Sequence, residues 1–250
     1  VLQVLLPAHA GAQPSWSLRR SMPTPRYIHA VALGGDGRIY ALGGNAQAGV
    51  LATAEVYTPA TDSWSSLPSM PSGREFFAAA TGSDGRVYAI GGWNGSPLAS
   101  VVAWNATAGA WQSVTSMSRA RQTFAAVADD NGRIFAIGGS GSSTPFGDVE
   151  FYNPSTGAWS PAAAMLQVVQ SPKGSKGLDG RIYVLGDGSA TFQAYNPQTN
   201  SWAQLAPFPN PRSGFAVATR SDGRIYVVGG NLGGFNVVGW VDIYDPVANT

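Results

Sequence analysis

The sequence contains no cysteine, only two histidines and few charged side chains. Without cysteine the chain can form no disulfide bond, no thiol nucleophile and no cysteine-ligated metal site. Two histidines, His9 and His29, are too few for a multi-histidine metal site. Charged residues make up 12% of the chain and the formal net charge is +1, which gives no electrostatic reason to expect nucleic acid or an anionic membrane as a partner. We expect no cofactor.

Long hydrophobic runs are also missing, since none approaches the roughly 20 apolar residues that a membrane-spanning helix requires. Residues 1–7 are apolar, and residues 8–12 contain two Ala-x-Ala patterns. That combination is typical of the end of a secretory signal sequence, and the alternative is an ordinary N-terminal arm. We therefore assign residues 1–14 to an arm or a clipped signal remnant and expect a secreted or extracellular protein.

Glycine is abundant, with 32 residues, and it recurs in a pattern. The nine residues Asp-Gly-Arg-Ile-Tyr-Ala-Leu-Gly-Gly at 36–44 return in related form at 84–92, 131–139, 179–187 and 222–230, at steps of 43 to 48 residues. A period of this size indicates a repeat architecture. Each Asp-Gly or Asn-Gly predicts a type I′ hairpin turn, and the glycine pair allows positive φ or close approach of another backbone.

Each repeat unit opens with a tryptophan and closes a third strand with an aromatic residue. The opening residues are Trp16, Trp64, Trp111, Trp159 and Trp202, and the closing residues are Tyr57, Trp104, Tyr152, Tyr195 and Tyr244. Four of the closing aromatics stand seven residues before the next tryptophan, across a turn. Each unit therefore holds four short strands, which is the content of a propeller blade.

Glycine pair, tyrosine and tryptophan at this period resemble the kelch repeat, over residues 15–250. The resemblance implies an all-β, five-bladed kelch-type β-propeller of four-stranded blades, although kelch propellers more often have six or seven blades. Trp16 has no third strand before it, and no tryptophan follows Tyr244. We therefore expect residues 16–22 to join the C-terminal blade and close the ring. The alternative is a fragment of a larger propeller that is cut at Thr250.

What recurs in every blade is scaffold, so function is free to lie where the blades differ. Two kinds of loop share one face and should surround the mouth of the central channel. The first positions after the arginine are Tyr27, Glu75, Gln122, Gln170 and Ser213, and the first after the glycine pair are Asn45, Trp93, Ser140, Gly188 and Asn231. The arginines Arg26, Arg74, Arg121 and Arg212 either bond carbonyls and carboxylates between blades or act as donors in the mouth.

Blade four departs from the pattern because its inner strand carries Lys173 and Lys176, the only lysines of the chain. Either Lys173 faces a wet channel near Asp187, or this blade is irregular. Trp93 and Trp240 are not required by the scaffold. If exposed, their rings suit sugar stacking or a peptide anchor, and burial between loops is the alternative.

The leading hypothesis is a non-catalytic, monomeric binding propeller that recognises a protein segment or a glycan. Its predicted ligand-binding residues are Arg26, Tyr27, Asn45, Arg74, Glu75, Trp93, Arg121, Gln122, Gln170, Lys173, Arg212, Ser213, Asn231 and Trp240. The alternative, implied by resemblance, is a small sugar-active enzyme similar to kelch-like sialic acid epimerases, with Glu75 as acid/base and Arg74 or Arg121 on a substrate carboxylate. A purely structural array is a third possibility.

Overall fold

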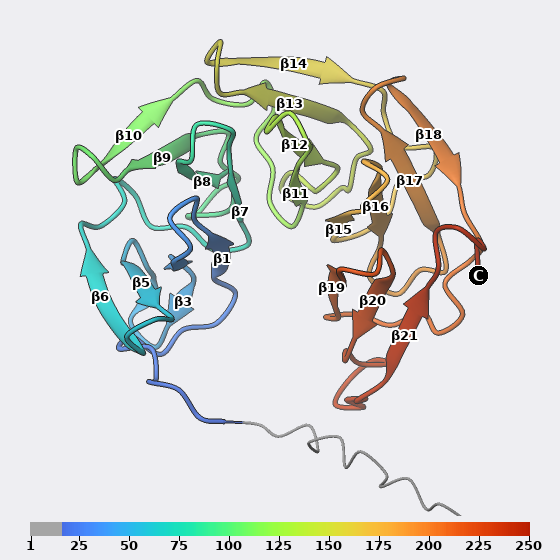
Figure 1. Cartoon of the computed structure of the whole chain (residues 1–250), viewed down its shortest axis with the longest axis horizontal. Coiled ribbons are helices and arrows are strands. Elements are labelled where there is room, and N and C mark those ends of the chain that lie inside the picture. Colours follow the sequence, from blue (N-terminus) through green and yellow to red (C-terminus); the bar gives the residue numbers. More distant parts are fainter. Residues whose placement is uncertain (1–16) are drawn as a thin grey trace, which may run out of the picture.

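The computed structural model describes residues 17–250, and the predicted arm or signal remnant lies outside these described residues. Every regular element of the described residues is a β-strand. Five sheets stand side by side around a central axis, each with its first strand innermost (Figure 1). This confirms the predicted all-β, five-bladed propeller.

Four of the blades are four-stranded antiparallel sheets, and their strands follow one another from the axis outward. Blade one holds β1 (Ala30–Leu33), β2 (Ile39–Leu42), β5 (Ala54–Thr58) and β6 (Ser63–Leu67). Blade two holds β7 (Ala78–Thr81), β8 (Val87–Ile90), β9 (Val101–Asn105) and β10 (Ala110–Val114). Blade three holds β11 (Ala125–Ala128), β12 (Ile134–Ile137), β13 (Val149–Asn153) and β14 (Ala158–Ala162). Blade four holds β15 (Lys173–Lys176), β16 (Ile182–Leu185), β17 (Phe192–Asn196) and β18 (Ser201–Gln204).

Blade five has three strands within the described residues, β19 (Ala216–Thr219), β20 (Ile225–Val228) and β21 (Val241–Tyr244). A separate small hairpin, β3 (Asn45–Ala46) with β4 (Gly49–Val50), projects from the loop between β2 and β5.

The Asp-Gly residues lie in the inner hairpins as predicted, but the predicted type I′ turn is wrong, because only the glycine has a positive φ and a type I′ turn requires it at both central residues. In blade one, Leu33 pairs with Ile39 across the turn, and Gly37 has a φ of 76°, a conformation that glycine adopts without steric cost. The Asp36 carboxylate accepts hydrogen bonds from the backbone N–H of Arg38, at 3.0 Å, and from the Tyr40 hydroxyl, at 2.7 Å. The acidic residue of this motif is therefore part of the scaffold.

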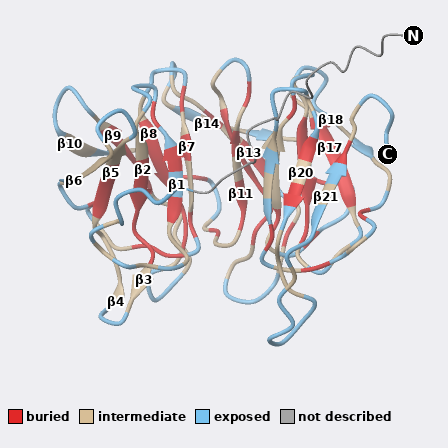
Figure 2. Ribbon diagram, turned by 60° about the horizontal axis from the view of Figure 1, so that its bottom comes forward, coloured by how far each residue is buried: buried red, intermediate tan, exposed pale blue. Residues whose placement is uncertain are grey.

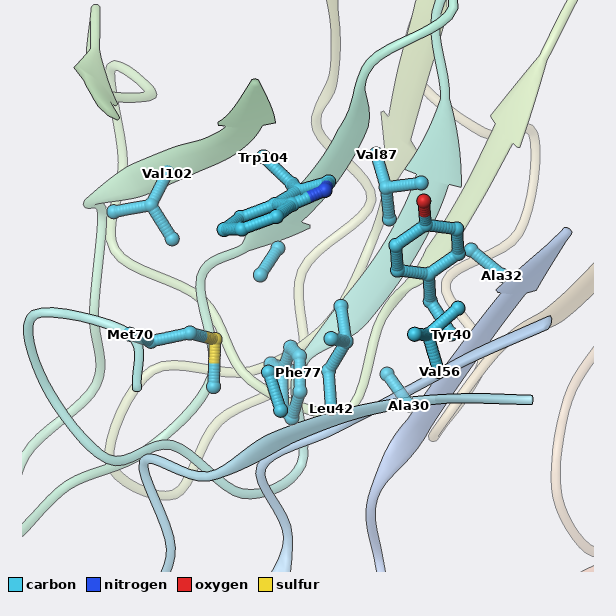
Figure 3. Close-up of a cluster of buried hydrophobic side chains, with 12 residues drawn as sticks. Ala30, Ala32, Tyr40, Leu42, Val56, Met70, Phe77, Val87, Val102 and Trp104 are labelled. Carbon is cyan, nitrogen blue, oxygen red and sulfur yellow. The ribbon is translucent and has the colours of Figure 1, made fainter. Parts of the chain in front are cut away.

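The core consists of four apolar clusters, one between each pair of neighbouring blades. The cluster between blades one and two includes Leu42, Met70, Phe77 and Trp104 (Figure 3). Burial of each such side chain contributes about 1.5–3 kcal/mol. Burial is heaviest in the second and third strands of the central blades, whereas β21 is largely exposed (Figure 2).

The outer-strand tryptophans lock each blade to the one before it. Each ring packs on the closing aromatic of its own blade, with ring centroids 5.2 to 5.5 Å apart. Each indole N–H also donates to a backbone carbonyl of the preceding segment, and the four acceptors are Arg20, Pro68, Thr115 and Ala163. The predicted packing role of these tryptophans is confirmed.

The expected closure of the ring by the N-terminal strand is wrong for the residues that the structure describes. Residues 17–22 form no strand and do not pair with β21. Arg20 instead bonds to blade one, because its N–H donates to Asp62 and its carbonyl accepts from Trp64. Blade five lies across an open gap from blade one (Figure 1), so the segment that is held against blade one does not reach it. Trp16 lies outside the described residues.

Candidate functional site at the channel mouth

The channel mouth is built by one backbone pairing that recurs in four of the five blades. The residue after the arginine position forms an antiparallel bridge with the residue after the glycine pair, in the pairs Tyr27–Asn45, Glu75–Trp93, Gln122–Ser140 and Ser213–Asn231. The two sets of loop residues are therefore side by side, as predicted. Because the five blades form an open arc, these pairs line an arc and not a closed ring.

Tight backbone geometry holds each pair in place. The residue after the bridge has a positive φ in all five blades, at Ile28, Phe76, Thr123, Ser171 and Gly214, with values from 42° to 67°. Ile28 and Thr123 are β-branched, so this conformation is strained for them. A Cβ atom on Gly92 would come within 2.5 Å of the Phe77 Cβ and 2.7 Å of the Glu75 carbonyl oxygen. Glycine is therefore required where the strand end passes beneath the mouth.

The four arginines are buried beneath the mouth. The side chains of Arg26 and Arg212 have 0% exposure, and Arg74 and Arg121 are 0% and 1% exposed. Three of them pair with carboxylates of the third strand, in the pairs Arg26–Glu55, Arg121–Glu150 and Arg212–Asp242. All four also donate to backbone carbonyls. These contacts favour the structural role, and the guanidinium groups are not exposed to a ligand at the mouth.

Arg74 differs from the other three because Val102 stands where they have a carboxylate. Its guanidinium donates to the carbonyls of Gly91 and Ser100, both at 3.1 Å. Burial lowers the pKa of Arg74 to about 10. This arginine is therefore held by uncharged carbonyl and hydroxyl groups.

The side chains that do reach the mouth are polar or aromatic. Tyr27 is 60% exposed and Gln170 is exposed, whereas Asn45, Trp93, Gln122, Ser213 and Asn231 are intermediate. Glu75 is buried, and its carboxylate accepts a 2.6 Å hydrogen bond from the Asn45 amide. That bond links the mouths of blades one and two. Between blades three and four, a polar hollow is lined by Thr123, Ser140, Ser143, Pro145, Gln170 and Ser171.

Blade four brings two charged side chains to the mouth. β15 is a regular strand, with Lys173 opposite Leu185. The Asp187 N–H donates to the Gln170 carbonyl at 2.8 Å, which is the bond that Trp93 makes to Glu75 in blade two. Asp187 therefore occupies the mouth position that the sequence pattern assigned to Gly188.

Asp187 stands where the other blades have the second glycine, so counting along the chain placed the mouth position at Gly188. Burial raises the pKa of Asp187, and the charge of Lys173 and the Gly214 N–H oppose that rise. The Gly214 N–H donates to the Asp187 carboxylate at 3.1 Å. The signal that could have revealed Asp187 is the replacement of the second glycine itself.

Trp240 does not join the mouth pairs. It directly precedes β21 at the open end of the arc, is 44% exposed, and its ring centroid lies 5.9 Å from the Arg212 guanidinium carbon. The preceding loop exposes three more apolar side chains, Leu232, Phe235 and Val237.

The described residues contain no group of three or more His, Cys, Asp or Glu side chains that could hold a metal ion. His29 is half-buried at the start of β1, and burial together with the neighbouring Arg26 charge lowers its pKa. Within residues 17–250 no helix has the length and hydrophobicity to cross a membrane. The groups at the mouth can donate and accept hydrogen bonds, stack on a flat ligand and pair with one charge of either sign.

Comparisons with known proteins support the repeat architecture. The family model described as "Kelch motif" matches residues 26–71, 76–118 and 123–166, which together exceed half of the chain. A search of the curated proteins finds no significant match. Among solved structures, "Structure of YjhT" aligns with a TM-score of 0.78 and 14% identity, covering 94% of this chain and 89% of that one. Significant matches include 598 solved chains, so the fold alone selects no function.

Proposed function

Because the chain belongs to the kelch repeat family, we propose that it is a binding propeller that recognises a protein segment or a glycan over the channel mouth. The observation that carries the proposal is that the repeated side chains and the variable side chains lie at different depths at the mouth. The repeated arginines and their partners are buried beneath it, whereas the side chains that vary between blades stand above them.

The mouth residues suit a ligand with both flat and polar surfaces. Tyr27 and Trp93 offer rings at the first two blades, and aromatic rings can stack on sugar rings or hold an apolar peptide side chain. Gln122, Gln170 and Asn231 offer amides that can both donate and accept. Lys173 and Asp187 add one charge of each sign at blade four. This arrangement favours recognition through several weak contacts.

The test is binding to glycan and peptide arrays by the wild type and by a Trp93→Ala/Glu75→Gln double variant. We expect the variant to lose at least tenfold in affinity for the ligand that the wild type selects. The matched control is Leu178→Ala, which removes an exposed apolar side chain from an Asp-Gly turn on the opposite face, and it should bind as the wild type does. Equal binding by the double variant and the control would contradict a site at the mouth.

The enzyme alternative rests on Glu75, the one buried carboxylate of the mouth pairs. Arg74 and Arg121 are enclosed and bonded to carbonyls, so they are not available to bind a substrate carboxylate. Sugar mutarotation followed by polarimetry would favour this alternative if Glu75→Gln abolished the activity while ligand affinity stayed unchanged.

We also propose that the protein acts outside the cell. The proposal is based on the Ala-x-Ala patterns of residues 8–12, which are typical of the end of a secretory signal sequence. Detection of the native protein in the medium, cleaved near these residues, is the corresponding test.

A further inference from the structure

Blade five exposes an apolar face that the other blades bury. Val228, Val241 and Ile243 are 45%, 54% and 50% exposed. Strand register places them at the positions of Ile90, Val101 and Ala103 in blade two, which are 0 to 1% exposed against blade three. An apolar face of this kind on a soluble protein indicates a partner.

Blade one exposes the opposite half of the same kind of interface. Val31 and Leu33 are 53% and 65% exposed, and register places them at the positions of Ala79 and Thr81 in blade two. Ala79 packs into the cluster between blades one and two, and the Thr81 hydroxyl donates to blade one. The two ends of the arc therefore present the two complementary faces of a blade–blade interface.

The turn that follows β21 has the geometry of the turns that precede an outer strand in the other blades. The Asn249 side chain accepts from the Tyr244 hydroxyl at 2.8 Å and from the Ala206 N–H at 3.2 Å. In blade four, Asn200 accepts from Tyr195 and Ala163 in the same way, and its turn leads directly into the outer strand β18. The turn that starts an outer strand is thus already formed in blade five.

Beside this edge lies an apolar groove, whose lining includes Leu185, Phe192, Phe208, Val227 and Tyr244. The corresponding cluster between blades three and four is covered by Trp202, the outer-strand tryptophan of blade four. The groove therefore fits an indole carried on a strand that pairs with β21.

Arg20 marks the other end of the gap. Its carbonyl accepts the Trp64 indole N–H at 2.8 Å. The three matching acceptors, Pro68, Thr115 and Ala163, each lie just beyond the end of an outer strand. Arg20 thus stands where the outer strand of a blade packed on blade one would end.

We propose that the gap between β21 and β1 is the docking seat of one further repeat unit of the same kind. Its tryptophan strand completes blade five, and its next three strands form a sheet that packs between blades five and one. The seat continues the four blade–blade interfaces already present in the molecule. A second copy of the chain, docked by its own end face, would leave the edge of β21 and the groove beside Tyr244 uncovered.

The test uses the repeat that the chain itself provides. A copy of residues 64–110 is fused after Thr250, because Asn249 and Thr250 hold the places of Asp62 and Ser63 and the copied Trp64 then falls opposite Tyr244. We expect a monomer in light scattering, a Tm at least about 5 °C higher than that of the parent chain, and a several-fold drop in binding of a hydrophobic dye. Amide exchange in Val241–Tyr244 should slow at least tenfold. The matched control carries Trp64→Ala, Phe77→Asp and Val87→Asp within the copied segment only, which removes its packing residues.

Three outcomes would overturn the proposal. The fusion could melt with the control or fail to fold, which would show that the gap does not accept the unit. The parent chain could be a dimer whose β21 amides are already protected, which would identify a second copy as the occupant. The parent could also be a monomer with protected β21 amides and no dye binding, which would mean that the arc closes on itself. Ligand binding at the mouth is measured in a separate experiment, so a failure of the proposed binding function would leave the proposal for the gap unaffected.

Discussion

Blades two and three are neighbours with the same four-stranded arrangement, yet their buried arginines have different hydrogen-bonding partners. In blade three, Arg121 pairs with the buried Glu150 at 2.7 Å. In blade two, Arg74 has Val102 at the corresponding position and no carboxylate. Both guanidinium groups donate to the carbonyl of the first residue of the glycine pair, Gly91 or Gly138. The common requirement is therefore a donor to these carbonyls, and the carboxylate is an addition.

Blade four lacks both charges. Val169 replaces the arginine there and Gln193 replaces the acid. The Gln193 side chain accepts from the Leu166 N–H at 3.1 Å and donates to the Gln167 carbonyl at 2.8 Å. When the charge of the base is absent, a neutral amide takes the place of the acid. The third-strand carboxylate therefore occurs only in blades that also have the arginine, and this dependence can be tested by removing the two charges singly and together.

The largest effect is expected from Arg121→Met in blade three. It leaves Glu150 buried without its counter-charge, and breaking a buried pair from one side destabilises by about 3–5 kcal/mol. Arg74→Met in blade two removes a charge that has no buried partner, so we expect a loss of about 1–2 kcal/mol for the unsatisfied carbonyls. Urea unfolding of both variants gives the difference.

The double variant Arg121→Met/Glu150→Leu completes this test. Replacing both charges by apolar groups should recover most of the loss, because no uncompensated charge remains. Equal losses of unfolding free energy for the two single methionine variants would contradict this prediction. They would show that the carboxylate in blade three does not affect the cost of removing the arginine.

A smaller, pH-dependent effect is expected at the hairpin turns. In blade two the Tyr88 hydroxyl donates to Asp84 at 2.6 Å, whereas blade three has Phe135 at that position. Burial, and then the bond to Asp84, raises the pKa of Tyr88 above its ordinary value of 10.0, just as burial raises the pKa of Tyr40 to about 12.

A tyrosine whose pKa is higher in the folded state stabilises the protein below pH 10 and loses that contribution as the pH rises further. Tyr88→Phe should therefore cost about 1 kcal/mol at pH 7 and progressively less above pH 10. Unfolding free energies measured from pH 7 to 11 test this, and parallel curves for wild type and variant would contradict the pKa shift.

The smallest effect is expected at the strained mouth residues. Thr123 of blade three and Phe76 of blade two have φ values of 49° and 51°. A β-branched side chain tolerates this region less well than an unbranched one. Thr123→Gly should therefore stabilise the folded protein by about 0.5 kcal/mol, once the larger conformational entropy of glycine in the unfolded state has been subtracted from the strain that is relieved. Phe76→Gly should not stabilise it. Thermal unfolding resolves the difference, and the reverse order would show that strain is not what separates the two sites.

The repeat pattern was sufficient to predict the scaffold of this protein. Asp-Gly turns, glycine pairs and spaced aromatics are local signals, and each acts within its own hairpin or on its immediate neighbour. The same regularity predicted that Tyr27, Glu75 and Gln122 would share one face with the residues after the glycine pairs, and the bridges place the two sets side by side. It failed at Asp187, because an aspartate replaces the second glycine there and only the hydrogen bond from its N–H to the Gln170 carbonyl shows that it holds the mouth position.

The sequence by itself determined the four-stranded blade, the packed tryptophan–aromatic pairs and the number of blades, because these depend on periods of a few residues that repeat. Only the tertiary structure decided that the arginines lie beneath the mouth and that the five blades form an open arc. Both depend on the angle at which one sheet packs on the next, a quantity set by contacts between whole faces that no single motif encodes.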